Sequence, residues 1–119
     1  MIKDWKHTLH PVKAVVIEPI SFFDHRVAAP TFYQKIREIC TEKHIPFIVD
    51  ESRTGVGITG KYWGHEHWYL ENSPDIVIFG RATQVSGFYS KAQFRPKQIH
   101  KFSNVGQLDL VKLKTYQII

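Results

Sequence analysis

Two carboxylates stand at the ends of apolar runs, and both could do chemistry. Asp50 closes the run from Pro46 to Val49, and Glu18 follows a run of branched residues just before Pro19. A carboxylate at the end of a buried strand is costly unless a cation or several hydrogen-bond donors meet it. Asp50 is therefore a candidate for holding a protonated group of a ligand. Glu18 fits such a role and the role of an exposed strand-end carboxylate equally well.

A glycine-rich loop that begins at Gly55 and ends at Lys61 matches two phosphate-binding patterns, G-x-G-x-x-G and G-x-x-x-x-G-K. In both patterns backbone N–H groups surround phosphates at a helix N-terminus. Tyr62 stands where the second pattern needs Ser or Thr to bind magnesium, and residues 51–54 separate Gly55 from the strand that the first pattern requires next to it. A small phosphate- or nucleotide-binding module built on this loop is therefore a second alternative function.

His65 and His67 flank Glu66 and raise the question of a metal site. The pattern predicts a short helix over residues 62–70. Residues two apart on a helix point about 200° from each other and cannot share an ion, whereas on a strand they could. We therefore expect no metal site here.

The elements that must position these residues alternate between strand and helix. A helix is expected over residues 31–43, with Thr31 and Gln34 as a capping box and an apolar stripe at Phe32, Ile36, Ile39 and Cys40. Strands are expected over residues 14–17, 47–50, 75–79 and, shorter, 87–90, and a terminal helix fits residues 107–119. The first strand, the helix and the second strand form a right-handed βαβ unit with buried parallel strands. The fold class is an open, mostly parallel α/β sheet with flanking helices.

Several motifs together carry a family resemblance. Ile48-Val49-Asp50-Glu51, Thr54-Gly55, Thr59-Gly60-Lys61 and the run from Trp63 to Trp68 resemble the central part of class III pyridoxal-phosphate aminotransferases. Within that family the chain is most similar to the 4-aminobutyrate and lysine aminotransferase group. The resemblance implies a fragment of the large domain of the fold-type I architecture. It covers about residues 13–106, and the expected division is a lead-in over residues 1–12 and one partial domain over residues 13–119.

The resemblance also assigns roles to single residues. It implies that Asp50 holds the protonated pyridine nitrogen of the cofactor, and that Arg53 replaces a glutamine at its phenolic oxygen. Asn104 would stand near the threonine that reaches the phosphate, and Glu18 at a glutamate that helps to switch between substrates. The lysine that forms the Schiff base has its counterpart at Ala82, after Arg81. We expect Arg53 to pair with Asp50, because an unpaired buried carboxylate is expensive, and Lys91 to be a surface charge.

Composition limits the partners. The 119 residues, 43% hydrophobic and 23% charged, are ordinary for one soluble domain, and the net charge of +5 comes from scattered residues, so nucleic-acid binding is not expected. The single cysteine, Cys40, indicates a core residue and a reducing compartment, either the mitochondrial matrix or the cytoplasm. There is no membrane-spanning run. Missing parts of the family fold would leave apolar surface, so we expect a protein partner or a homo-oligomer.

These observations predict a degenerate or truncated member of the 4-aminobutyrate/lysine aminotransferase family. Pyridoxal phosphate is the family's cofactor, and here it would not be bound covalently. Alanine supplies neither a nucleophile nor a base, and Arg81 stays protonated. We therefore expect no catalysis, and we expect a structural role instead. The alternative is a segment or an altered copy of a working aminotransferase.

Overall fold

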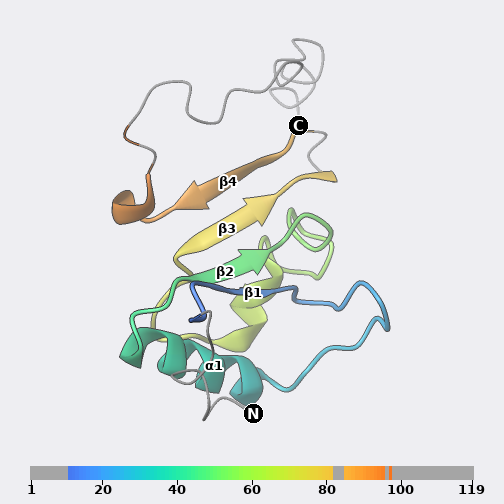
Figure 1. Ribbon diagram of the computed structural model, residues 1–119. Coiled ribbons are helices and arrows are strands. Elements are labelled where there is room, and N and C mark those ends of the chain that lie inside the picture. Colours follow the sequence, from blue (N-terminus) through green and yellow to red (C-terminus); the bar gives the residue numbers. More distant parts are fainter. Residues whose placement is uncertain (1–10, 82–84, 96, 98–119) are drawn as a thin grey trace.

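Four strands form one sheet whose spatial order follows the chain. The computed structural model describes residues 11–81, 85–95 and 97. The strands are β1 (Val15–Ile17), β2 (Phe47–Asp50), β3 (Ile76–Phe79) and β4 (Gly87–Ser90), in the order β1-β2-β3-β4. The first three run parallel and β4 is antiparallel to β3. The α-helix α1 (Pro30–Glu42) connects β1 with β2, and two 3₁₀ helices, η1 (Gly64–Trp68) and η3 (Ala92–Phe94), follow β2 and β4 (Figure 1).

The predicted architecture is confirmed: the sheet is open and mostly parallel, with helices beside it. The four strands occur within one residue of their expected ranges, because branched apolar runs bounded by proline, glycine or polar residues have few other options. The short helix expected over residues 62–70 is the shorter η1. The expected terminal helix, residues 107–119, lies outside the described residues, as do Ala82 and Asn104. No helix in the described ranges combines the length and apolarity needed to cross a bilayer.

One face of the sheet carries the core. Phe47 and Val49 of β2 are fully buried against Tyr33 and Cys40 of α1 and Trp68 of η1. The rings of Tyr33 and Trp68 stack at 3.9 Å with an interplanar angle of 10°, which joins the two helices over the sheet. Cys40 is therefore a core residue, as predicted, and burial raises the pKa of its thiol.

The helix α1 differs from its prediction at its start and in its buried face. Pro30 occupies the first turn after Ala29, and no side chain caps the N-terminus, so the expected Thr31–Gln34 capping box is wrong. Gln34 instead donates to the carbonyl of Trp68. Tyr33, Arg37 and Cys40 are the buried residues, whereas Phe32 is 52% exposed. The predicted stripe is confirmed at Cys40 and at Ile36, which packs on the core, and is wrong at Phe32. Tyr33 was missed because its tryptophan partner lies far along the sequence.

The opposite face of the sheet is open. Paired residues of neighbouring strands share a face, so Val16, Ile48 and Ile76 lie in one row, and Ile78 and Phe88 in the next row. Val16 is 59% exposed and Phe88 47% exposed. The expectation that β1 is a buried strand is therefore wrong for this face, because no described helix covers it. We call Val16, Ile48, Ile76, Ile78 and Phe88 the open face.

A buried ion-pair network joins the helix to the end of the sheet where β2 and β3 begin. Asp75 accepts from Nη1 of Arg37 at 2.7 Å, from Nζ of Lys91 at 2.8 Å and from the backbone N–H of Phe47 at 2.9 Å. Burial alone would raise the pKa of Asp75, but the hydrogen bonds from Arg37, Lys91 and Phe47 lower it below its usual value. The expectation that Lys91 is only a surface charge is wrong.

Candidate functional site

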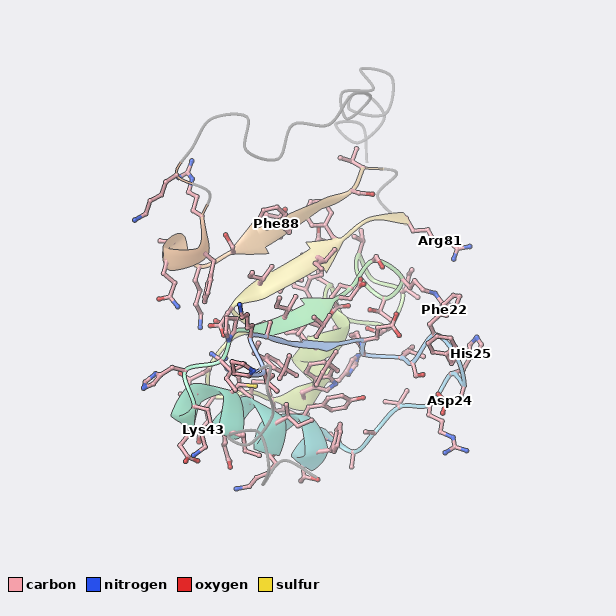
Figure 2. All side chains as sticks on the ribbon, in the orientation of Figure 1. Phe22, Asp24, His25, Lys43, Arg81 and Phe88 are labelled. Atoms are coloured by element: carbon pink, nitrogen blue, oxygen red, sulfur yellow. The ribbon has the colours of Figure 1, made fainter. Side chains whose placement is uncertain are left out.

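The candidate site lies at the carboxyl edge of the parallel strands. Because β1, β2 and β3 are parallel, Glu18, Asp50 and Gly80 follow or end neighbouring strands at the same edge. Figure 2 shows Phe22 and Arg81 at this edge, while Lys43, at the end of α1, points away at the opposite edge. Ligands of open α/β sheets bind outside this edge. The structure thus brings the two carboxylates predicted from sequence to the same edge.

Asp50 is the anchor candidate. Its side chain is half-buried, and Oδ1 accepts the backbone N–H of Ser52 at 2.9 Å. No ion pair to Asp50 occurs within the described ranges. One carboxylate oxygen is therefore held by the backbone, and the other can accept a hydrogen bond from a ligand.

Glu18 and Arg53 both contact Phe22. The backbone N–H of Phe22 donates to Oε2 of Glu18 at 2.8 Å, and the guanidinium carbon of Arg53 lies 4.7 Å from the centroid of the Phe22 ring. The expected Asp50–Arg53 ion pair is wrong, because the aromatic ring holds the cation instead. Glu18 is half-buried rather than exposed.

Glu51 is the site residue that sequence reasoning missed. It is 1% exposed, and its carboxylate accepts from the backbone N–H of Gly64 at 3.0 Å, the backbone N–H of His65 at 2.8 Å, Nδ1 of His65 at 2.8 Å and the hydroxyl of Thr54. Burial raises the pKa of Glu51, but these hydrogen bonds lower it below its usual value, so the carboxylate is ionised and Nδ1 of His65 carries the proton. The signal available in the sequence was alternation: next to Asp50, Glu51 had to point to the opposite side, toward the core.

The glycine loop turns its donors inward. The N–H of Gly55 donates to Glu51, those of Val56 and Gly57 to Tyr62, and that of Gly60 to Gly57. Gly57 and Gly60 have φ values of 90° and 85°, which suit glycine in this tight loop. Phosphate binding needs these N–H groups to point outward. The geometry therefore counts against the phosphate-binding alternative.

The two histidines have separate contacts. His65 contacts Glu51, while Nε2 of His67 lies 3.0 Å from the carbonyl of Thr59. Among the described residues no three acidic, histidine or cysteine side chains gather in a way that could hold a metal ion.

Four described lysines contact groups other than Asp50. Lys91 is bound to Asp75 at the far edge, and Lys35 and Lys43 belong to α1 and its end. Lys61 follows β2, but its Nζ donates to the carbonyl of Glu66 at 3.2 Å and lies 4.6 Å from the centroid of the Tyr69 ring. None of these amines contacts Asp50.

Comparisons with known proteins identify the family. The family model for class-III aminotransferases matches residues 2–117, and the chain therefore belongs to that family. It is 38% identical to a 4-aminobutyrate aminotransferase of Dictyostelium discoideum over 100% of this chain and 24% of that protein. It is 42% identical to a 4-aminobutyrate aminotransferase of Emericella nidulans over 87% of this chain and 21% of that protein. The chain thus spans about a quarter or less of these relatives' length.

Solved structures agree with the fold. A lysine aminotransferase from M. tuberculosis matches with a TM-score of 0.61 and 38% identity, over 66% of this chain and 18% of that one. An ornithine δ-aminotransferase from Plasmodium falciparum matches with a TM-score of 0.55 and 27% identity, over 59% of this chain and 18% of that one. The sheet is therefore a fragment of the fold-type I aminotransferase architecture, as expected.

The described residues fit one end of pyridoxal phosphate, the cofactor of this family. The Asp50 oxygen that takes no hydrogen bond from a described residue would suit the protonated ring nitrogen. When bound, the cofactor supplies an electron sink for amino-group transfer. In this chain Asp50 is the candidate for the carboxylate that would keep the ring nitrogen protonated.

Proposed function

We propose that this chain is a non-catalytic class III aminotransferase unit with a structural or assembly role. Asp50 retains the capacity to hold a pyridinium nitrogen, but no covalent link to pyridoxal phosphate forms, because the family resemblance aligns Ala82 with the Schiff-base lysine. Without that amine the chain has neither the nucleophile that captures the aldehyde nor the base that moves the proton.

The observation that carries this proposal is the engagement of Lys91, the first lysine after Ala82. Its Nζ is 2.8 Å from Oδ1 of Asp75 and 3.2 Å from the carbonyl of Ser73, at the edge opposite Asp50. Leaving that position would break a partly buried ion pair, so Lys91 does not substitute for the missing amine.

An assembly role is supported by the open face. Apolar residues on both its rows are exposed or half-buried, and contiguous apolar surface of this kind is typical of interaction sites. The partner in this proposal is another protein or a second copy. The compartment is the mitochondrial matrix or the cytoplasm; relatives from Caenorhabditis elegans and Homo sapiens are named mitochondrial 4-aminobutyrate aminotransferases, which favours the former.

Reductive trapping tests the missing amine. The chain is mixed with equimolar pyridoxal phosphate, reduced with borohydride, and its lysines are mapped by mass spectrometry. We expect no lysine to be labelled above its level in the urea-unfolded chain. Stoichiometric labelling of one lysine in the folded chain would overturn the proposal.

Ligand binding supplies a second test with a matched control. Pyridoxamine phosphate, whose amine needs no lysine, and pyridoxal phosphate should bind with about equal affinity, and Asp50→Asn should weaken both. Glu66→Gln is the control, because Glu66 is exposed and caps η1 at Trp63. A strong preference for the aldehyde form would indicate covalent capture.

The alternative is a segment of a working aminotransferase whose lysine comes from elsewhere. It is favoured by the Asp50 oxygen that accepts no hydrogen bond from any residue of the described ranges. Mixing this chain with a relative's large domain lacking the same segment separates the two functions: amino-group transfer by the mixture would support the alternative.

A further inference from the structure

The cation nearest in sequence to Asp50 is held on an aromatic ring instead of on the carboxylate. Arg53 follows Asp50 by three residues, across a turn in which the N–H of Thr54 donates to the carbonyl of Glu51. A half-buried carboxylate three residues away in the chain is a plausible ion-pair partner for a guanidinium. Arg53 nevertheless stacks on Phe22, with its guanidinium carbon 4.7 Å from the ring centroid.

Phe22 can hold Arg53 because its own loop is fastened at that edge. Glu18, at the end of β1, accepts the N–H of Phe22 at 2.8 Å. Ser21 donates to the carbonyl of Arg26, and His25 donates to the carbonyl of Ser21, which closes the loop on itself. The aromatic ring is thus fixed beside the carboxyl edge, where Figure 2 shows it.

We propose that Phe22 is a positioning residue that keeps Asp50 open, by holding the Arg53 guanidinium away from the carboxylate that would otherwise pair with it. Glu18 supports this arrangement by accepting the backbone N–H of Phe22. The ligand class served is a protonated nitrogen heterocycle, which would use the Asp50 oxygen that no described residue occupies. This inference rests on the proposed role of Asp50.

The two states of Arg53 differ in a way that can be measured without any ligand. In the native chain the Nε–H resonance of Arg53 should be shifted by the ring current of Phe22, and Asp50→Asn should leave it unchanged. In Phe22→Ala the ring-current shift should vanish, and adding Asp50→Asn should then move the resonance, because Arg53 pairs with Asp50 only in that background. An equal effect of Asp50→Asn with and without Phe22, or no effect in either, would overturn the inference.

Binding of pyridoxamine phosphate gives the functional readout. Phe22→Ala should weaken binding by roughly two- to fivefold, since the ligand must displace an ion pair of surface strength. The same substitution in an Arg53→Gln background should have no effect. Phe22→Trp should retain native binding, because indole also stacks on a guanidinium.

Phe23→Ala is the matched control, since Phe23 is 91% exposed and contacts the Phe22 ring rather than Arg53. If the native chain binds no pyridoxamine phosphate, the proposed role of Asp50 fails, while the resonance experiment still decides whether Phe22 positions Arg53. Equal weakening by Phe22→Ala in the native and Arg53→Gln backgrounds would contradict the inference.

Discussion

Nζ of Lys91 lies 2.8 Å from Oδ1 of Asp75, although Lys91 follows β4 and Asp75 precedes β3. The same carboxylate binds Arg37 of α1 and the N–H of Phe47 at the start of β2. One acidic side chain therefore connects the helix with three strands at a single edge of the sheet.

We predict that Asp75→Asn destabilises the chain far more than Lys91→Ala. Removing the carboxylate leaves the Arg37 guanidinium buried without its partner, which costs about 3 kcal/mol. The side chain of Lys91 is 38% exposed, so its loss should cost about 1 kcal/mol or less. Urea unfolding followed by circular dichroism measures both. Equal losses in the free energy of unfolding for the two variants would mean that the stabilisation by Asp75 comes from its ion pair with Lys91 rather than from its ion pair with Arg37.

Glu51 predicts a pH dependence of stability. Its pKa is lower in the folded chain than its ordinary value of 4.5, because hydrogen bonds from His65, Thr54 and two backbone N–H groups outweigh burial. The stabilisation is therefore fully present above pH 4.5 and is lost as the pH falls through the lower, folded-state pKa. Glu51→Gln should lower the free energy of unfolding at neutral pH and flatten its acid limb. An acid limb of unchanged steepness would assign the dependence to Asp75, whose pKa is also lowered.

The glycine loop predicts a contrast between two alanine substitutions. A Cβ at Gly55 would lie 2.8 Å from Cζ3 of Trp63 and 3.0 Å from the carbonyl oxygen of Glu51, so Gly55→Ala overpacks the loop at a cost of roughly 1–3 kcal/mol. Gly57 has free space around it but a φ of +90°, so Gly57→Ala costs only conformational strain, about 1 kcal/mol. Thermal unfolding compares the two, and Trp63 fluorescence should change for Gly55→Ala alone. A larger loss at Gly57 would contradict this account.

The open face predicts self-association that polar substitutions reduce. Val16→Thr and Phe88→Thr remove apolar surface from exposed strand positions, so the free energy of unfolding should change by only about 0.5 kcal/mol. Sedimentation velocity should show a smaller associated fraction for both variants. Phe23→Ser serves as the control, because Phe23 is 91% exposed but lies outside the sheet. A native chain that sediments as a monomer would remove the basis for the assembly role.

The strands were predictable because their signal is local, whereas the contacts of the site are not. A run of branched apolar residues such as Ile76–Phe79 predicts a strand whichever neighbouring strand it pairs with. The buried face of α1 depends on Trp68, and the direction of Arg53 depends on Phe22, both distant in sequence. Asp50 was identified from its place at a strand end, but its freedom from Arg53 could be learned only from the geometry. Glu51 was overlooked because a carboxylate in a core is rare unless several donors converge on it.

The sheet's spatial order equals its order along the chain. Each described strand after β1 therefore pairs with the one made just before it, and none of the four inserts between two earlier ones. Such a sheet can grow by addition at one edge during synthesis, with long connections at the two parallel steps (residues 18–46 and 51–75) and a short one before β4 (residues 80–86). Folding of this unit should accordingly proceed from β1 toward β4, with the two long parallel connections as its slower steps.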